Sequence, residues 1–181
     1  MKKLNEIARN CNITAYGFQA LKDFAQEYKK DGSSIVISSL SPAVMAEMGI
    51  MDYYAPVLPR GTILNTADDV RNADLSVQHV LTFWAPDLDY GHYAIVSRHA
   101  GTIEILKEQY PDAEVLDGNV TPEELHNKFV VGTLPPALIQ HAKAYRAVTI
   151  ADFDYAKDGD LGGEELADRI RFSEPITVEI R

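Results

Sequence analysis

An α/β fold, in which helices flank a mostly parallel β-sheet, is the fold class that the sequence predicts. The second half of the chain alternates short apolar runs with helical segments of about ten residues, which is the pattern of βαβ units. The runs VVGTL and AVTIADF are apolar at successive positions, as strands covered by helices on both faces require. The first half contains a similar strand, turn and helix in IVISSLSPAVMAEM.

The elements of the second half follow one another without long gaps. Their lengths and order predict strands at residues 92–99, 113–118, 130–135, 146–153 and 175–181, and helices at residues 101–110, 121–129, 136–145 and 162–172.

The first half is expected to alternate in the same way. Apolar residues of helical spacing predict a helix over residues 17–30. Ser41, Pro42 and Gly49 have the order of a cap, a first-turn residue and a stop, and Thr66 is a second candidate cap. We therefore expect strands at residues 33–40, 53–58 and 77–85, and further helices at residues 42–48 and 66–74.

Residues 84–92, WAPDLDYGH, form the best candidate boundary, because Pro, Gly and two Asp separate two apolar runs. We expect an N-terminal α/β region over residues 1–88, as an extension or a second small domain, and another domain over residues 89–181. IVISSLSPAVMAEM and AIVSRHAGTIEILK share strand, small polar turn and helix. This likeness is either the general similarity of βα units or an internal duplication, with residues 1–88 as a degenerate copy in a pseudo-dimer.

Charge and composition narrow the possible partners. With 17 basic and 27 acidic residues the net charge is −10, and no basic track for a nucleic-acid polymer is visible. A small anion remains possible, because helix N-termini and one or two Arg can hold a phosphate. No apolar run approaches the roughly 18–20 residues of a membrane span, and MKKLNEIARN lacks the apolar core of a signal peptide. A single cysteine, Cys11, fits a reducing cytoplasm, which is the expected location.

The turn after the strand at residues 92–99 is the strongest candidate site, because ligands of parallel sheets bind beyond the carboxyl ends of the strands. Ser97 offers a hydroxyl, Arg98 a bidentate phosphate fork, and His99 a proton near neutral pH. The helix that follows adds N–H donors. The structural alternative is that Ser97 caps the helix, Arg98 pairs with a surface carboxylate and His99 faces solvent.

Two further turns are expected at the same edge of the sheet. Gly132 permits close backbone approach and Thr133 can donate a hydrogen bond, although the glycine could serve the turn alone. Asp152 ends the next strand and begins the acidic loop 152–160. That loop lacks the EF-hand order of ligands, so we expect no metal there.

Several common catalytic motifs are missing from the sequence. It has no P-loop, no G-x-G-x-x-G, no G-x-S-x-G elbow and no H-x-x-x-H pair. His141 lies in an apolar segment and is expected to be a packed or capping histidine. No metal or other cofactor is therefore expected.

VSRHAGTIEIL, the turn Gly132–Pro135, the strand KAYRAVTI and the segment GGEEL follow one another in an order and spacing that resemble a small CRISPR-associated accessory family of type III systems. Members typically have a Thr-Arg-His-like triplet, here Ser97-Arg98-His99, followed by a Gly and a helix. The resemblance covers residues 92–181. Two features depart from the family: about half of this chain precedes the first family strand, and GGEEL lacks an Arg that the family often has before Gly-Glu-Leu.

The resemblance implies a Rossmann-like, CARF-like fold and a metal-independent ring nuclease. Such an enzyme opens a cyclic oligoadenylate, most simply cyclic tetra-adenylate, to linear products with a 2′,3′-cyclic phosphate, and thereby switches off antiviral signalling. Arg98 and His99 are then the catalytic residues. The substrate-binding residues are Ser97, Gly101, Gly132, Thr133 and Asp152.

A ligand with internal symmetry favours a two-fold cleft, so we expect a homodimer or the pseudo-dimer described above. Two alternatives stay open beside the enzyme, because fold does not fix activity. One is a sponge or sensor that binds the cyclic nucleotide without cutting it. The other is a Rossmann-like interaction module whose motif turns are structural.

Overall fold

The protein was analysed as a computed structural model that describes residues 1–28, 34–59, 61–86, 88–116, 119–154 and 156–181. Its strands are β1 (Lys2–Lys3), β2 (Asn12–Tyr16), β3 (Ser34–Ser38), β4 (Asp52–Pro56), β5 (Ser76–Trp84), β6 (Tyr93–Val96), β7 (Glu114–Leu116), β8 (Phe129–Gly132), β9 (Ala144–Ile150), β10 (Ile170–Phe172) and β11 (Ile176–Ile180). Its helices are α1 (Leu4–Asn10), α2 (Gln19–Gln26), α3 (Pro42–Glu47), α4 (Ala67–Ala73), α5 (Ala100–Gln109), α6 (Pro122–Leu125), α7 (Pro136–Ile139) and α8 (Gly163–Arg169).

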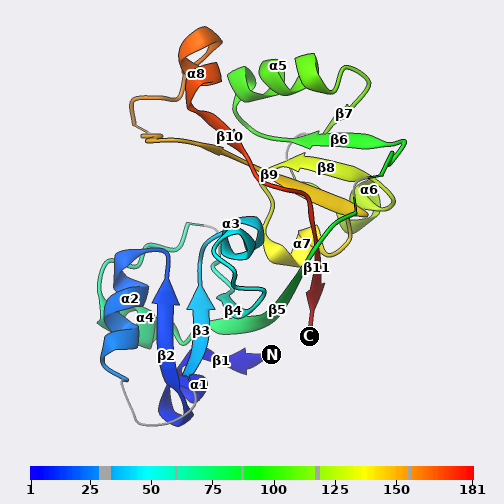
Figure 1. The fold of residues 1–181 in the computed structure, drawn as a ribbon. Helices are drawn as coiled ribbons and strands as arrows, with labels where there is room; N and C mark the ends of the chain where they lie inside the picture. Colours follow the sequence, from blue (N-terminus) through cyan, green and yellow to red (C-terminus); the bar gives the residue numbers. More distant parts are fainter. Residues whose placement is uncertain (29–33, 60, 87, 117–118, 155) are drawn as a thin grey trace.

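One mixed β-sheet runs through the whole molecule (Figure 1). Its order is β2-β3-β4-β5-β11-β9-β8-β6-β7, with β1 beside β5 and β10 beside β9. The strands β2, β3 and β4 are mutually parallel, as are β7, β6, β8 and β9. The central pair β5 and β11 is antiparallel to each other and to these two blocks. The expected α/β class with flanking helices is confirmed.

The last strand joins the two halves of the chain. β11 pairs with β5 from Ile176–Trp84 to Ile180–Val80, but with β9 only through Ile176 and Tyr145. The sheet therefore continues across the proposed boundary at residues 88 and 89, and the C-terminal strand lies between the halves.

Three apolar cores accompany this sheet. One outer core lies under α1, α2 and α4, and a second is formed by β6, β8 and β9 with α5 and residues around β10. The central core contains residues of both halves, including Met45, Tyr53, Val80, Tyr145 and Ile176. Because burial of apolar surface is the main favourable term in folding, this shared core binds the halves together.

The capping signals of the first half are confirmed. The Ser41 hydroxyl accepts a hydrogen bond from Ala43 N–H at the start of α3, and Gly49 follows the helix with a φ of +80°. Thr66 begins α4 with a capping box that it shares with Asp69. The helix expected over residues 17–30 is α2, and residues 29 and 30 lie outside the described part of the chain.

Three helices of the second half are shorter than expected. α7 ends at Ile139, and Tyr145, assigned to this helix from the sequence, belongs to β9. The segment expected as a helix to residue 129 ends at Leu125, because Phe129 begins the buried strand β8. The segment expected to run to residue 172 ends at Arg169 and continues as β10 beside β9. In each case strand pairing overrides the local helical pattern.

The short elements α1, β1 and β2 were not predicted. The strand β2, NITAY, alternates polar and apolar residues over only five positions, and it pairs with β3 over its whole length. Residues 117 and 118, expected to end a strand, lie outside the described residues. No helix in the described part of the chain is both long enough and apolar enough to span a membrane.

Candidate functional site

A cavity of about 1020 Å³ lies at the carboxyl ends of β6, β8 and β9. The chain leaves β6 through α5 toward β7 on one side and later returns through β8 on the other side. The site is therefore the topological switch point of the parallel block, where α/β sheets bind ligands. Its described lining is formed by Val96, Ser97, Arg98, His99, Thr102, Leu116, Asn119, Val120, Gly132, Thr133, Leu134, Pro135, Leu138, Val148, Thr149, Ile150, Phe153 and Gly159.

Arg98 lies at the exposed rim of this cavity. Its guanidinium forms no hydrogen bond or ion pair with any residue that the structure describes. The sequence left open that Arg98 pairs with a surface carboxylate, and the described residues show no such pair. A guanidinium in this position can form a bidentate pair with a phosphate without first giving up another partner.

His99 is the N-cap of α5. Its Nδ1 accepts a hydrogen bond from Thr102 N–H at 3.2 Å and lies 2.9 Å from Thr102 Oγ1. A backbone N–H can only donate, so Nδ1 is an acceptor and the ring proton is on Nε2. Nε2 is buried and has no hydrogen-bond partner among the described residues. His99 is therefore held as a donor whose N–H is unused.

An aromatic ring also fixes the position of His99. The ring of Phe153 meets the imidazole edge-on, with centroids 5.7 Å apart and planes at 79°. Both side chains line the cavity. The cap at Thr102 and the contact with Phe153 together leave the imidazole little freedom to turn.

Gly132 shapes the opposite turn. Its φ is +143°, and a Cβ at this position would lie 1.9 Å from the carbonyl oxygen of Val96. Only glycine allows β8 and β6 to approach this closely at their carboxyl ends. The close backbone approach expected at Gly132 is therefore found, and the backbone that approaches it is that of Val96 in the neighbouring strand.

Tyr145 supports the same turn from beneath. Its hydroxyl donates to the Gly132 carbonyl at 2.8 Å and accepts from Leu134 N–H at 3.3 Å. Burial raises the pKa of this hydroxyl, so it stays protonated and can fill both roles. The turn after β8 is thus a fixed wall of the cavity.

Ser97 and Thr133 are both in the lining, but their hydroxyls have partners. Ser97 Oγ accepts from His99 N–H at 3.2 Å. Thr133 Oγ1 donates to the Val148 carbonyl at 3.4 Å, and Thr133 N–H donates to the Val96 carbonyl at 3.0 Å. These residues order the turns that line the cavity.

Two predicted substrate-binding residues lie elsewhere. Gly101 is on α5, where a Cβ would meet the Leu161 carbonyl oxygen at 2.6 Å, so this glycine lets the helix pack against the loop that precedes α8. Asp152 is exposed and has a left-handed φ of +53°. Its backbone carbonyl accepts from Arg169, and it is not in the described lining.

The sequence reasoning missed several polar and aromatic lining residues, namely Thr102, Asn119, Thr149 and Phe153. Asn119 could have been found, because it follows β7, a parallel strand that ends at the same edge. Thr102 could have been found from its position three residues after the capping His99.

The loop 152–160 is organised by an ion pair. Asp158 accepts from Asp154 N–H at 2.8 Å and from Arg169 Nη2 at 2.9 Å. These hydrogen bonds lower the pKa of the Asp158 carboxyl. Arg169 also donates from Nε to the Ala151 carbonyl at 2.8 Å. The guanidinium of Arg169 is therefore the cation that holds this acidic loop. Within the described residues no group of three or more potential metal ligands is found.

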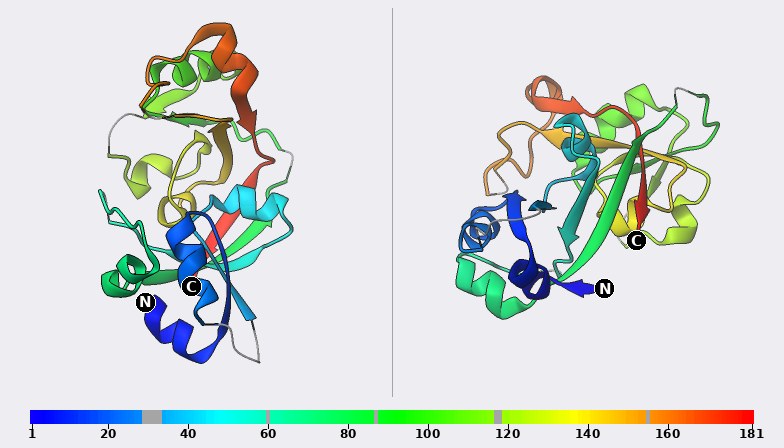
Figure 2. Two further views of the ribbon diagram at one scale, coloured as in Figure 1. Left: turned by 90° about the vertical axis from the view of Figure 1, so that its left-hand side faces the viewer. Right: turned by 60° about the horizontal axis from the view of Figure 1, so that its bottom comes forward.

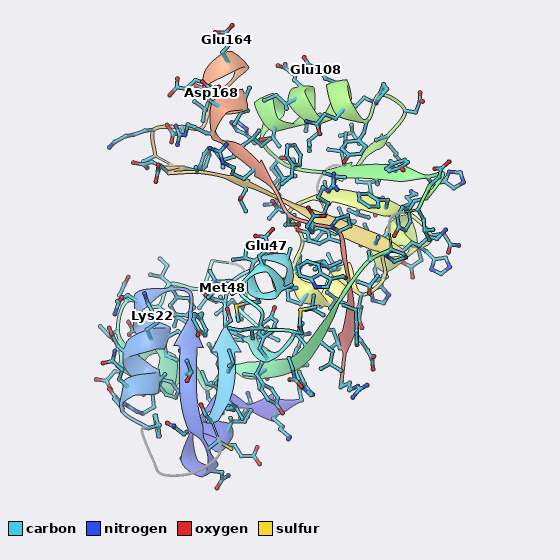
Figure 3. All side chains as sticks on the ribbon, in the orientation of Figure 1. Lys22, Glu47, Met48, Glu108, Glu164 and Asp168 are labelled. Atoms are coloured by element: carbon cyan, nitrogen blue, oxygen red, sulfur yellow. The ribbon has the colours of Figure 1, made fainter. Side chains whose placement is uncertain are left out.

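The described lining of the cavity carries a charge opposite to that of the whole chain, although the loop that contributes Phe153 and Gly159 also contains four aspartates. Arg98 and His99 are the ionisable residues in the described lining, which contains no Asp or Glu. Figure 3 shows Glu108, Glu164 and Asp168 on the outer helices α5 and α8. In a protein of net charge −10, this distribution favours an anionic ligand.

A second cavity, of about 340 Å³, lies at the opposite ends of the strands. Aromatic residues and Arg146 line it. Arg146 Nη1 donates to the Tyr110 hydroxyl at 3.1 Å, and its guanidinium lies over the Phe129 ring. Arg146 Nε is buried without a partner among the described residues, but Glu174 shares the lining and could balance this cation. The larger cavity at the carboxyl edge, which has no described carboxylate, is therefore the better candidate for an anionic ligand.

Known proteins give no assignment for this chain. No protein-family model matches it, and no curated protein or solved structure matches it. The likeness to the CRISPR-associated family therefore stays a prediction that rests on the sequence motifs, and the function has to be argued from the geometry of the cavity.

Proposed function

We propose that the cavity binds a small phosphate-containing nucleotide, and that this ligand is a cyclic oligoadenylate, most simply cyclic tetra-adenylate, which the protein cleaves without a metal. The Rossmann-like, CARF-like assignment of the fold belongs to this proposal. It is supported by the cavity at the switch point between β6 and β8 and by the motif resemblance around Ser97-Arg98-His99.

One observation carries the proposal. A guanidinium and a buried imidazole N–H, neither of which has a partner among the described residues, line one cavity that has no described carboxylate. A buried donor without a partner is costly, and His99 Nε2 has none among the described residues, so a ligand oxygen that satisfies it would be favoured. The volume of about 1020 Å³ is at the upper end of the ~300–1,000 Å³ typical of small-molecule sites, which suits a ligand of several nucleotide units.

The chemistry of ring opening asks little of the protein beyond positioning. The ribose 2′-oxygen forms a bond to the adjacent phosphorus, the bond from phosphorus to the 5′-oxygen breaks, and the product ends in a 2′,3′-cyclic phosphate. Water takes the proton that the 2′-hydroxyl gives up and supplies the proton that the leaving 5′-oxygen takes up. Arg98 would stabilise the charge on phosphorus, and His99 Nε2–H would donate to a phosphate oxygen or to the leaving oxygen.

The direct experiment is incubation of the purified protein with cyclic tetra-adenylate in EDTA, followed by chromatography of the products. Linear products with a 2′,3′-cyclic phosphate are expected. Arg98→Ala should weaken binding about tenfold to a hundredfold, since a hydrogen bond to a charged group contributes about 1.5–3 kcal/mol. Arg181→Ala, which removes an exposed Arg paired with Glu179, is the charge-matched control and should bind as the parent does.

His99→Asn separates catalysis from stability. Asn can cap α5, whereas Ala costs about 1 kcal/mol at an N-cap position. We expect His99→Asn to keep the melting temperature of the parent and to lose turnover. Parent-level turnover by this variant would remove His99 from the proposed mechanism.

A second function, binding without cleavage, is favoured by one specific feature. Nδ1 of His99 is occupied as the acceptor for Thr102 N–H, which holds the ring as a hydrogen-bond donor rather than as an acid carrying two protons. A sponge or sensor would need only that donor. An intact ring recovered in stoichiometric amounts from the denatured protein would establish this alternative, and a ring that never binds would overturn both.

A further inference from the structure

Counted outward from the centre, the two sides of the sheet have the same arrangement of strands, apart from β7 at one end. Outward from the centre, one side has β5, β4, β3 and β2, and the other has β11, β9, β8 and β6. In each series the outer three strands are mutually parallel, and the central strand is antiparallel to them. Such an order is what a two-fold axis between β5 and β11 would produce.

The strand registers agree with this symmetry residue by residue. Within β2–β3–β4–β5 the paired residues are Tyr16–Ser38, Ile37–Tyr54 and Tyr53–Val80. Within β6–β8–β9–β11 the corresponding pairs are Val96–Gly132, Val131–Arg146 and Tyr145–Ile176. This correspondence relates Val80 to Ile176, so the axis passes through the pair Thr82–Val178 at the centre of the β5–β11 ladder.

The turns after the strands repeat as well. Ser39 N–H donates to the carbonyl of Tyr16, the last residue of β2, at 3.2 Å. Thr133 N–H donates to the carbonyl of Val96, the last residue of β6, at 3.0 Å. The sequence pair that this symmetry aligns is thus IVISSLSPAVM with FVVGTLPPALI of β8 and α7, whereas AIVSRHAGTIEILK belongs to β6 and α5.

The helices and cores follow the same correspondence. α3 packs on β5 as α7 packs on β11, and α2 contacts α4 as α5 contacts α8. Met45 of α3 and Ile139 of α7 share the central core with Tyr53 and Tyr145. Among the described elements, β7, α6 and β10 of the second half have no counterpart in the first, and β1 and α1 of the first half have none in the second.

The two corners differ in chemistry. Phe18 is the N-cap of α2, in the place that His99 has before α5, and Gly17 stands where the second half has Ser97 and Arg98. Phe18 N–H donates to Ser39 Oγ at 3.3 Å, so the first corner uses its own hydroxyl to satisfy this donor. The first corner therefore has neither the cation nor the imidazole.

From this symmetry we infer that the chain is a built-in pseudo-dimer, in which residues 12–84 replace the second subunit and one chain binds one ligand between an active corner at Arg98–His99 and an uncharged corner at Gly17–Gln19. The identity of the ligand rests on the proposed function. In Figure 1 the arrowheads of β2 and β3 point up and those of β6 and β8 point left, so both carboxyl edges border one side of the molecule. The described lining of the cavity itself comes from the second half alone, so the ligand would have to extend beyond it to reach the first corner. The left panel of Figure 2 looks onto this side, with the first unit below and the second above.

Light scattering and native mass spectrometry test the first part of the inference. The mass expected is that of one chain, 20.1 kDa, with and without cyclic tetra-adenylate, and one ring should bind per chain. A dimer of chains in the absence of ligand, or one ring per two chains, would overturn it. If no ring binds, the proposed function fails, while the mass of the free protein still decides whether one chain is self-sufficient.

Opposite charges at Gln19 test the second part. Gln19 is the exposed first residue of α2, the counterpart of Ala100 in α5. If the anionic ring extends to this corner, Gln19→Arg should tighten binding and Gln19→Glu should weaken it, each about threefold at about 0.1 M salt, where exposed charges interact over about 10 Å. Asn10→Arg and Asn10→Glu, at the amino end of β2, are the controls and should leave the affinity unchanged. Equal affinities for both Gln19 variants would show that the first corner does not face the ligand.

Discussion

At the scale of single residues, Gly132 leaves no room for a side chain. Its backbone is in the left-handed region and a Cβ would overlap the Val96 carbonyl. We expect Gly132→Ala to lower the free energy of unfolding by about 2 kcal/mol or more, from backbone strain and overpacking. Urea denaturation measures this change. Gly159→Ala is the matched control, since Gly159 also lines the cavity but a Cβ there meets nothing within 4 Å.

Tyr53 and Tyr145 allow the same substitution to be compared at two equivalent positions. Tyr145 has two hydrogen bonds at the turn after β8, whereas the buried Tyr53 hydroxyl has no partner among the described residues. Tyr145→Phe should cost about 1–3 kcal/mol because it leaves buried backbone groups unpaired. Tyr53→Phe should be neutral or stabilising, because it removes an unsatisfied hydroxyl.

Thermal and urea unfolding of the two variants distinguish the roles of these tyrosines. A loss of stability of similar size in both variants would mean that the Tyr53 hydroxyl also has a partner. The two hydrogen bonds of Tyr145 would then not distinguish it from Tyr53.

At the scale of elements, the loop that joins β9 to α8 depends on Asp158. The pKa of this carboxyl is lowered by the Asp154 N–H and by Arg169, so its contribution to stability is present above the usual pKa of about 3.9 and is lost as the pH falls through the lower folded value. We expect Asp158→Asn to be less stable than the parent at pH 6 and equally stable near pH 2.

Urea denaturation at several pH values measures this difference. Asp160→Asn, which removes a neighbouring exposed carboxylate, is the control and should follow the parent at every pH. A stability difference for Asp158→Asn that is the same at pH 6 and pH 2 would argue against the ion pair with Arg169.

The sequence predicted the starts of those helices whose capping residues are adjacent in the chain. Ser41 and Thr66 marked the starts of α3 and α4, and the rule of carboxyl ends brought Arg98, His99 and Thr133 to one cavity. Sequence was insufficient where pairing with distant strands decides. The segment after Ile139 has helical spacing, but Tyr145 gains its partners from the turn after β8 and so lies in a strand.

The roles of two site residues also depended on tertiary contacts. Gly101 follows the motif triplet, yet its neighbour is Leu161, which is far along the chain. Asp152 ends a strand at the right edge, but Arg169 binds its backbone carbonyl and its side chain is outside the described lining. No local pattern reports where residues 161 and 169 will lie.

At the scale of the whole molecule, the central ladder makes the two halves interdependent. The C-terminal strand β11 covers β5, and the central core contains side chains from both halves. A chain cut at the boundary proposed from the sequence would leave each fragment with an open strand edge and half a core. We expect fragments 1–88 and 89–181 to be insoluble when expressed singly and to copurify in equal amounts when expressed together.

Two substitutions in β11 make this prediction specific to the ladder. Val178 is 8% exposed and pairs with Thr82 at the centre, whereas Glu179 is on the exposed face of the same strand. With a tag on fragment 1–88, Val178→Lys in the other fragment should abolish copurification, because it buries an unpaired charge, and Glu179→Lys should preserve it. Either fragment folding alone with one cooperative transition, and not retaining the other, would show that the chain is two independent domains. Association through β5 and β11 would instead show that the two halves form one unit. A symmetric dimer builds such a unit from two chains, and this protein builds it from one chain.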